Sequence, residues 1–205
     1  MIKIEKISVY NFENSIRGMR NALKSWDRSD SYNYYDPDLH FNTYIIGEND
    51  MKLALKLIKA GSEHSKFCRQ IFISMDITAP DYWWKEMDTY KINTTANSTS
   101  TMHKITSRLL DMNDFSIDEW DDNDFMVLNN LNQLIEEYQN TKDKNVWRRI
   151  IQKLPMSYNY LRTWTANYQN LRNMYFQRRN HKLDCWQDFC KVIEGLPYSQ
   201  LITIS

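Results

Sequence analysis

The sequence predicts an α+β fold: a single helix-rich domain over residues 1–205, with a central mixed or antiparallel sheet. Three observations lead to this prediction. The chain has 205 residues, which is long enough for one well-formed core but short for two. Glycine and proline are scarce, with four of each, which disfavours a loop-rich all-β architecture. Segments with alternating apolar residues are separated by longer segments with helical periodicity.

The chain is expected to begin with a strand and a helix. Met1–Tyr10 reads as a strand in which Ile2, Ile4 and Ile7 are available for burial. A helix is expected over Ser15–Ser25.

A long polar segment, Trp26–Tyr44, is rich in Tyr and Asp and is predicted to be a loop that serves as a lid or a partner contact. Asn49 is a predicted cap for the next helix, and Gly61 is placed well to end that helix. Cys68–Thr78 alternates in part and is predicted to be a core strand.

The second half of the chain is predicted to be mostly helical. A helix can start after Ala79-Pro80 with proline in its first turn. Ser116 and Glu119 form a predicted capping box before an amphipathic helix that reaches Tyr138. The remaining predicted elements are a helix over Lys144–Lys153, a strand over Tyr158–Trp164, and helices near Tyr168–Arg178 and Asp184–Glu194.

Composition excludes several classes of protein. The three cysteines, Cys68, Cys185 and Cys190, are too few for a disulfide framework, so a reducing, cytoplasmic location is expected. No apolar stretch is long enough to span a bilayer. The four histidines are scattered and no metal-ligand spacing is found, so no metal is expected. Phosphate-binding glycine loops and the G-x-S-x-G nucleophile motif are missing, so a cofactor is expected to carry any chemistry.

Charge is concentrated towards the C-terminus although the chain as a whole carries no net charge. Between Lys142 and Lys182 there are ten Lys or Arg residues and one acid, Asp143. Aromatic and amide side chains alternate with these cations over residues 154–189, so the segment could stack on a flat ring and hold an anion. Nucleic-acid binding through this block is possible but less favoured, because no nucleic-acid motif is present.

A second polar segment, residues 90–103, contains hydroxyls and amides but no carboxylate, with Lys91 near its start. Such a loop can surround a phosphate or the polar edge of a ring. On composition alone, an ordinary Ser/Thr/Asn-rich surface loop is the more common explanation.

Together these segments resemble the flavin-dependent thymidylate synthases over roughly residues 50–190. The resemblance is carried by a helix end and a following His/Glu segment, by the strand before Ala79-Pro80, and by a series of spaced residues in the C-terminal third. The positions that match are Leu57–Gly61, Ser62–His64, Phe67, Leu154-Pro155, Trp164–Asn167, Leu171, Asn173, Arg178 and Trp186.

The resemblance implies a mixed α/β subunit that forms a homotetramer with flavin sites shared between subunits. It implies reductive methylation of dUMP, or of a related pyrimidine nucleotide, with FAD as cofactor. NADPH and methylenetetrahydrofolate would be the co-substrates. The alternative is a diverged, catalytically inactive homologue that binds a nucleotide or a protein partner.

The resemblance also implies roles for individual residues. Asn167 and Asn173 match positions that contact the flavin, and Arg178 matches the arginine that grips the uracil base. A guanidinium aimed at a pyrimidine carbonyl would stabilise the charge that develops as the ring accepts carbon. The implied nucleotide-binding residues are Lys85, Glu86, Ser98, Ser100 and Arg149, and the other implied flavin-binding residues are Arg69, Tyr90, Lys91, Thr94 and Asn97.

The chain departs from the family's signature R-H-R-x-x-S-x-N-x-x-S-x-R in its charged positions. Thr89 and Tyr90 replace the first Arg and His, and Met102 replaces the last Arg. Ser98 stands at a family glutamate, and Arg69 at a histidine that meets the flavin. Phosphate-binding cations would therefore have to come from Arg69, Lys91 or Arg149.

Overall fold

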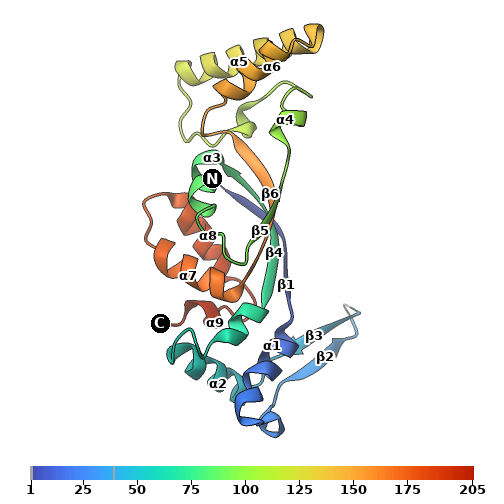
Figure 1. Cartoon of the computed structure of the whole chain (residues 1–205), viewed down its shortest axis with the longest axis vertical. Helices are drawn as coiled ribbons and strands as arrows, with labels where there is room; N and C mark the ends of the chain where they lie inside the picture. Colours follow the sequence, from blue (N-terminus) through green and yellow to red (C-terminus); the bar gives the residue numbers. More distant parts are fainter. Residues whose placement is uncertain (1, 39) are drawn as a thin grey trace. The chain divides into compact units, whose positions relative to one another are not determined.

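The computed structural model describes residues 2–38 and 40–205 and has the predicted α+β architecture (Figure 1). A four-stranded sheet has the order β1-β4-β6-β5, and β2 and β3 form a separate antiparallel hairpin. The strands are β1 (Lys3–Tyr10), β2 (Tyr32–Asp36), β3 (Phe41–Ile45), β4 (Phe72–Pro80), β5 (Thr95–Ser98) and β6 (Asn159–Asn167). The α-helices are α1 (Phe12–Met19), α2 (Glu48–Lys59), α3 (Asp81–Met87), α4 (Thr101–Lys104), α5 (Asp122–Thr141), α6 (Lys144–Lys153), α7 (Tyr168–Arg178), α8 (Asp184–Glu194) and α9 (Gln200–Thr203). Short 3-10 helices are η1 (Asn21–Leu23), η2 (Trp26–Arg28), η3 (Lys66–Gln70) and η4 (Met112–Asp114).

The chain divides into two compact units. Unit 1 contains the start of β1, Asp76–Lys91 and Ala96–Trp164. Unit 2 contains Lys6–Met75, Ile92–Thr95 and Thr165–Ser205. All four strands of the larger sheet begin in one unit and end in the other. A single domain over residues 1–205 stays a prediction, and the two units are described separately below.

Strands β4 and β6 are paired antiparallel, as their opposed arrows in Figure 1 show. In unit 2, Thr165 Oγ1 donates to Ser74 Oγ at 3.1 Å, and in unit 1 Thr163 Oγ1 donates to Asp76 Oδ1 at 2.6 Å. Residue numbers therefore increase along β4 as they decrease along the paired part of β6, as in an antiparallel pair. The opposite face of β4 is apolar and buried, which explains the alternation in its sequence: the buried residues are Ile73, Met75, Ile77 and Ala79.

The start of the predicted strand Cys68–Thr78 was wrong. Lys66–Gln70 forms η3, and the strand begins only at Phe72. Cys68 is fully buried in this helical turn, so its apolar position in the sequence reflects packing and not strand alternation.

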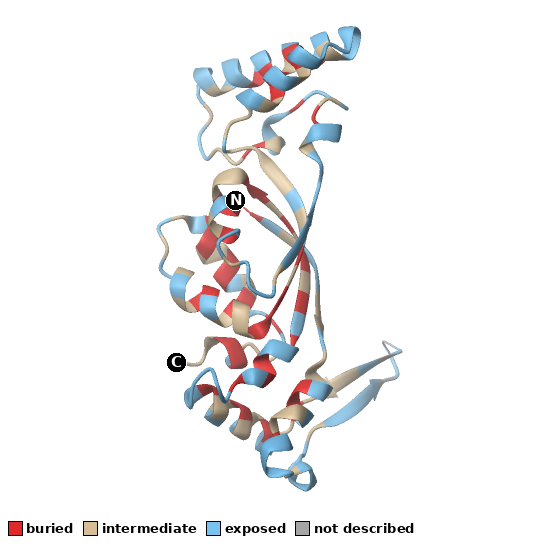
Figure 2. Cartoon of the chain, in the orientation of Figure 1, coloured by how far each residue is buried: buried red, intermediate tan, exposed pale blue. Residues whose placement is uncertain are grey.

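Unit 2 has a core of helices in which α7 packs against η3, α8 and α9. Figure 2 shows buried positions recurring along α7 and α8, as expected of helices with one apolar side. Tyr168 is completely buried and its hydroxyl donates to the carbonyl of Pro197 at 2.5 Å, which joins the start of α7 to the C-terminal segment. Trp186 and Phe189 of α8 are also completely buried.

A buried ion pair joins the end of α1 to α2. Arg20 Nε donates to Asp50 Oδ1 at 2.5 Å, and the two side chains are 5% and 0% exposed. Ser29 and Ser31 donate to the second carboxylate oxygen of Asp50 at 2.5 and 2.6 Å. The segment between the two helices is therefore anchored through one buried carboxylate, which accepts hydrogen bonds from Arg20, Ser29 and Ser31.

The predicted start of α2 needs correction. The helix begins at Glu48 after Gly47, so Asn49 is already inside it. The carboxylate of Asp30 accepts from the backbone N–H groups of Asn49 and Asp50 at 2.8 and 3.1 Å. The start of α2 is therefore capped by Asp30, which is distant in the sequence, and not by Asn49.

Two other boundaries in the first half were also wrong. The helix predicted over Ser15–Ser25 is α1, which starts at Phe12 and ends at Met19, followed by η1. Part of the loop predicted over Trp26–Tyr44 is the β2–β3 hairpin, in which Tyr34 pairs with Thr43; Leu39 of this segment lies outside the described residues. The hairpin was missed because exposed tyrosines give its outer face no apolar alternation.

Strand β1 confirms the first predicted element, although Met1 lies outside the described residues. Ile7 is 39% exposed, so its expected burial was wrong. Lys6 has φ 50°, which is in the left-handed region and interrupts the alternation of side chains. Residues after Lys6 therefore do not follow the period-2 pattern that begins at Ile2.

Unit 1 contains the antiparallel helices α5 and α6, and α6 has the predicted bounds. The start of α5 differs from the prediction, because Asp121 and Asp124 form its capping box. Ser116 instead bonds to the beginning of β6, donating from its backbone to Ser157 at 2.8 Å and from its hydroxyl to Asn159 at 2.8 Å. The capping box predicted for Ser116 and Glu119 was therefore wrong, and aspartate, an equally good N-cap residue, caps the helix five residues later.

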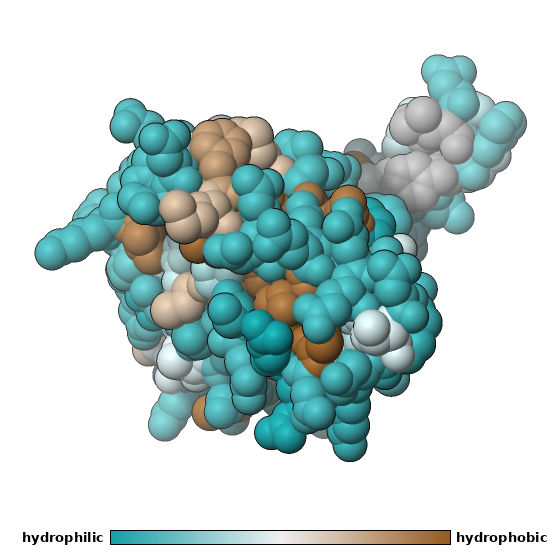
Figure 3. All heavy atoms as spheres, turned by 90° about the horizontal axis from the view of Figure 1, so that it is seen from above, coloured by the Kyte–Doolittle hydropathy of each residue, from teal (hydrophilic) through white to brown (hydrophobic). Residues whose placement is uncertain are grey.

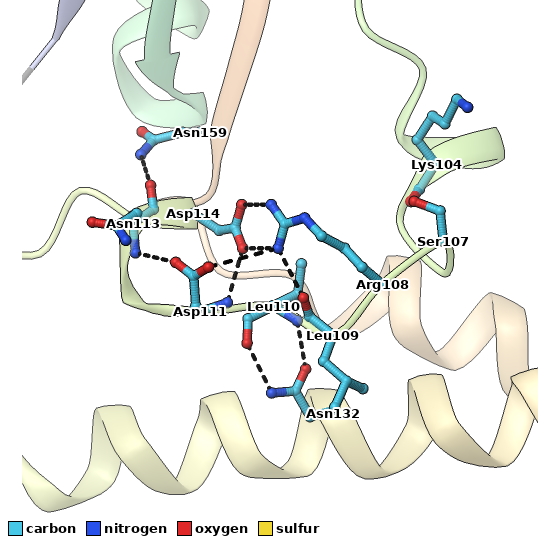
Figure 4. A network of polar contacts seen from close by, with 10 residues as sticks. All are labelled: Lys104, Ser107, Arg108, Leu109, Leu110, Asp111, Asn113, Asp114, Asn132 and Asn159. Atoms are coloured by element: carbon cyan, nitrogen blue, oxygen red, sulfur yellow. Dashed lines mark hydrogen bonds and ion pairs between the residues drawn. The ribbon is translucent and has the colours of Figure 1, made fainter.

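Polar contacts fix the segment before α5 (Figure 4). Arg108 forms a bidentate ion pair with Asp114, with N–O distances of 2.7 and 2.5 Å. The side-chain amide of Asn132 on α5 spans the backbone N–H and C=O of Leu110 at 2.8 and 2.9 Å. Figure 3, which looks onto α5 and α6, shows small apolar patches among mainly hydrophilic residues; Met126 on α5 is 60% exposed.

Replacing Asp50 with Ala is expected to lower the free energy of unfolding by about 3–5 kcal/mol, because Arg20 would remain buried without its partner. Chemical denaturation measures the change. Glu48→Ala is the matched control in the same helix: its ion pair with Lys52 is exposed, and the change is expected to stay within about 0.5 kcal/mol. Equal losses in the two variants would contradict the importance of the buried pair.

The same carboxylate predicts a pH dependence. Burial by itself would raise the pKa of Asp50, but the hydrogen bonds from Ser29, Ser31 and Arg20 outweigh it and lower the pKa below its ordinary value of 3.8. A lowered folded-state pKa contributes stability above pH 3.8, and this contribution is lost as the pH falls through the folded-state pKa. Stability measured between neutral and strongly acidic pH should therefore fall more steeply for the native chain than for Asp50→Asn.

Candidate functional site

In unit 2, the site predicted from the sequence centres on the start of α7, where β6 ends. Asn167 is 2% exposed and caps the helix: its side-chain oxygen accepts from the backbone N–H of Asn170 at 2.9 Å. The side-chain oxygen of Asn170 accepts in turn from the Asn167 backbone at 3.3 Å, which completes a capping box. Asn167 thus has a structural role that accounts for its spacing after the strand. A ligand contact from its side chain would use the remaining amide hydrogens.

Asn170 also joins this helix start to the second polar segment. Its side-chain nitrogen donates to the backbone carbonyl of Ile92 at 2.8 Å. Asn93 follows with φ 58°, a left-handed conformation that asparagine tolerates, and Thr94 is half-buried. The part of the 90–103 segment that belongs to unit 2 is therefore held beside the asparagines of α7. Asn170 was not among the predicted site residues, although its position three residues after an N-cap is a signal for such a contact.

Asn173 lies one turn further along α7 and is exposed. Its side-chain oxygen accepts from Gln169 Nε2 at 3.0 Å, and Gln169 Oε1 accepts from the buried Ser65 at 3.3 Å. Ser65 immediately precedes η3, on which Arg69 is exposed. Since α7 packs against η3, the structure brings Asn173 and the element carrying Arg69 to neighbouring positions.

Arg178 is the last residue of α7 and is half-buried. Its guanidinium carbon lies 4.7 Å from the ring centre of Trp186, a cation–π arrangement that keeps the planar group in place. Arg178 and Trp186 both belong to the predicted set, so two residues eight positions apart in the sequence are in contact.

In unit 1, the residues predicted near the nucleotide lie on α3 and directly after it. Lys85 is exposed and forms an ion pair with Asp81 at 3.2 Å, whereas Glu86 is half-buried. Lys91 is exposed and Tyr90 is half-buried. The ammonium groups of Lys85 and Lys91 are therefore both accessible, and that of Lys85 is paired with Asp81.

The signature-like residues that follow form an edge of the four-stranded sheet. All of β5 is exposed, including Asn97 and Ser98, and β5 bonds to β6 alone among the described strands. The backbone of Thr99 donates to Leu161 at 2.9 Å. Ser100 caps α4 by accepting from the backbone of His103 at 3.4 Å. The segment predicted to be a loop is thus a short strand and a helix cap with polar side chains at the surface.

Arg149 is exposed on α6, as are the other cations of this helix, Lys144, Arg148 and Lys153. The neighbouring Trp147 donates from its ring nitrogen to the backbone of Met102 at 3.1 Å. This bond places α6 beside the end of the signature-like segment, where the family has an arginine and this chain has Met102. Arg149 is therefore carried on the helix that contacts this position.

Arg162 is a further cation near the signature-like segment, and it was not among the predicted site residues. It follows Leu161, which bonds to Thr99, and its side chain is 17% exposed. The guanidinium lies 4.2 Å from the ring centre of Trp84 and donates to Asp88 at 2.8 Å. Its Nε atom is buried and has no hydrogen-bond partner among the described residues. Only the pairing of β5 with β6 reveals this cation, since it is more than sixty residues away in the sequence.

Two of the three cysteines have raised pKa values. Burial raises the pKa of the Cys68 thiol to about 12 and that of Cys190 to about 11, so neither is a thiolate at neutral pH. Within residues 2–38 and 40–205 there is no group of three or more His, Cys, Asp or Glu side chains that could hold a metal ion. None of the helices in these ranges is long and apolar enough to cross a membrane.

The predicted residues fall into two groups. Unit 2 carries Arg69, Thr94, Asn167, Asn173 and Arg178, arranged on or beside α7. Unit 1 carries Lys85, Glu86, Tyr90, Lys91, Asn97, Ser98, Ser100 and Arg149, on or near α3, β5, α4 and α6. Within each group the structure brings distant sequence segments together, and the assignment of ligand-binding roles stays a prediction.

Comparison by sequence finds neither a matching family model nor a matching curated protein. Comparison by structure does find similar proteins. Thymidylate synthase X (ThyX) from Helicobacter pylori, solved with FAD and dUMP, has a TM-score of 0.75 and 14% identity, with 99% of this chain and 98% of that chain covered. A second structure of the flavin-dependent enzyme from Helicobacter pylori, also complexed with FAD and dUMP, has a TM-score of 0.73 and 15% identity, with 97% and 98% covered.

A UMP/dUMP methylase, PolB from Streptomyces cacaoi, bound with 5-Br dUMP, is also similar. It has a TM-score of 0.56 and 14% identity, covering 95% of this chain and 89% of that chain. At these identities the comparison shows the fold, which is that of the flavin-dependent thymidylate synthases, as the sequence resemblance implied.

Asn167→Ala is expected to lower the free energy of unfolding by about 1 kcal/mol, because the backbone N–H of Asn170 would lose its cap. Asn167→Asp keeps an accepting oxygen and is expected to retain most of the stability. Thermal or chemical denaturation without any ligand measures both. A fully stable Asn167→Ala variant would contradict the capping role.

Proposed function

We propose that this protein binds FAD and a pyrimidine nucleotide and catalyses flavin-dependent reductive methylation of dUMP or a related nucleotide. The observation that carries the proposal is the arrangement on α7: Asn167 and Asn173 lie on one helix that ends in Arg178, held over Trp186. The same helix start contacts the 90–103 segment through Asn170. The similar structures with FAD and dUMP support this proposal by fold.

The chain's own residues would bind and orient the ligands. Asn173 offers an exposed carboxamide, and Arg69 offers an exposed positive charge on the neighbouring η3. FAD, when bound, would supply the hydride chemistry, with NADPH and methylenetetrahydrofolate as co-substrates. Arg178 would donate to a carbonyl of the pyrimidine and stabilise negative charge that develops on the ring.

Nucleotide phosphate would be bound by cations that differ from those of the family signature. In unit 1 the exposed candidates are Lys85, Lys91 and Arg149, together with the polar groups of Asn97, Ser98 and Ser100. A homotetramer with shared flavin sites is part of the proposal, and light scattering of the purified protein would test it.

A second candidate function is nucleotide or partner binding without catalysis. It is favoured by the side chains at the signature's charged positions: Thr89 and Met102 are exposed, Tyr90 is half-buried, and none is cationic. The two functions differ in turnover. If NADPH reduces the bound flavin and a methylated nucleotide is then formed, the protein is an enzyme. If the protein binds FAD and dUMP but forms no methylated product, the second function is supported.

The visible spectrum of the purified protein tests the proposal most directly. Flavin absorption that survives desalting, or that appears on the protein after FAD is added, is the expected result. A colourless protein that does not bind added FAD would rule out the flavoenzyme.

Arg178→Ala is expected to weaken dUMP binding by about 2 kcal/mol or more, roughly 30-fold, because a charged donor to the base would be lost. Isothermal titration with dUMP measures the affinity. The neighbouring Arg179→Ala is the control, since Arg179 is exposed and contacts the ring of Phe176 at 5.0 Å. If both variants bind dUMP like the native chain, the role assigned to Arg178 is wrong.

A further inference from the structure

Unit 2 contains a pocket that the proposed function does not use. It lies where the end of β1 and the start of α1 face the β2–β3 hairpin and residues 197–198, and its volume is about 460 Å³. Figure 1 shows the hairpin beside α1 and the end of β1. Pockets that bind small molecules commonly have volumes of about 300–1,000 Å³, so this one is large enough for a nucleoside.

Aromatic rings form part of the pocket wall and are fixed by contacts of their own. Phe12 packs edge to face on Tyr198, with ring centres 5.1 Å apart. The hydroxyl of Tyr198 accepts from the backbone of Ile46 and donates to the carbonyl of Tyr44, both at 3.0 Å. Tyr10 is 54% exposed at the same pocket. Fixed and accessible aromatic rings favour a planar ligand.

The hairpin contributes two carboxamides to the pocket. In its register Asn33 pairs with Tyr44 and Asn42 pairs with Tyr35, so Asn33, Asn42 and Tyr44 lie on the same face. The side chains of Asn33 and Asn42 make no hydrogen bond with the residues that the structure describes. A carboxamide offers both a donor and an acceptor, which matches the hydrogen-bonding edge of a nucleobase.

The charge of the pocket limits what it can bind. Glu13 is an exposed lining residue, and no Lys, Arg or His is among the described lining residues. A phosphate would meet a carboxylate and no cation, whereas an exocyclic amine could donate to Glu13. The pocket therefore differs in charge from the proposed nucleotide site, whose candidate residues include several cations.

The backbone of the pocket is strained at a residue that forms its wall. Tyr198 has φ 53°, a left-handed conformation that is uncommon for a bulky side chain. The two bonds of its hydroxyl hold it in this conformation. Such strain persists only where surrounding contacts fix it, and it is often found at ligand-binding sites.

From these features we propose that the pocket bounded by Tyr10, Phe12, Asn33, Asn42 and Tyr198, with Glu13 among its lining residues, binds an amine-bearing nucleobase or nucleoside that lacks a phosphate. Aromatic rings contact the plane of the base, Asn33 and Asn42 bond to its edge, and Glu13 accepts from its amine. The site is independent of flavin binding and of the proposed catalysis.

Titration of the full-length protein with adenosine, inosine and adenosine monophosphate tests the proposal. Adenosine is expected to bind at least about tenfold more tightly than inosine, which has a carbonyl in place of the amine, and than the monophosphate. No adenosine binding, or equal affinity for the three compounds, would overturn it.

Variants locate the binding. Asn42→Leu and Glu13→Ala are each expected to weaken adenosine binding about tenfold or more, because each removes a proposed hydrogen bond to the base, with circular dichroism confirming an unchanged fold. Asn140→Leu, at an exposed asparagine of α5, is the matched control and is expected to leave the affinity unchanged. If both pocket variants bind adenosine with unchanged affinity, the nucleoside binds elsewhere, for example at a flavin site, and the proposal is overturned. Loss of flavin binding leaves this test unaffected.

Discussion

The antiparallel pairing of β4 with β6 is the constraint that fixes the start of α7 and with it the positions of the candidate site residues on that helix. Its register fixes where β6 ends, and α7 begins immediately after that strand with Asn167 as its cap. In unit 2 the backbone of Tyr168 also donates to Ile71, just before β4, at 3.0 Å. A shift of one residue would move the buried side chains of β6, such as Trp164 and Ala166, to the opposite face, so the register is strongly specified.

Helix α7 has structural and proposed functional roles on different sides. Its buried residues, among them Leu171 and Met174, pack in the core of unit 2, and the guanidinium of Arg172 donates to the backbone of Ile202 at 2.8 Å. Asn173 is directed to solvent and Arg178 is held over Trp186. A rigid helix packed on one side can position polar groups on the other with little loss of conformational entropy on binding.

Polar residues that resemble functional ones can have structural explanations. Asn167 caps a helix, Ser100 caps another, and Lys85 pairs with Asp81. Their spacing in the sequence is therefore partly a consequence of the fold. Other predicted residues are exposed and make fewer contacts with the described residues: Asn173, Arg69, Lys91 and Arg149. Because the fold depends less on these side chains, substituting them tests ligand binding with the least effect on stability.

The sequence by itself determined the fold class, the bounds of α6, α7 and α8, and the fold family, because these depend on helical periodicity and on locally spaced motifs. It identified Asn167 as important but not as a cap bonded to Asn170. The tertiary structure alone decided the elements whose partners are distant: Asp30 caps α2 from nineteen residues away, the β2–β3 hairpin exposes its tyrosines, and Arg162 lies near β5 through strand pairing. The buried pair of Arg20 and Asp50 likewise has no local signal, since two ordinary charged residues become a core interaction only when folding removes both from water.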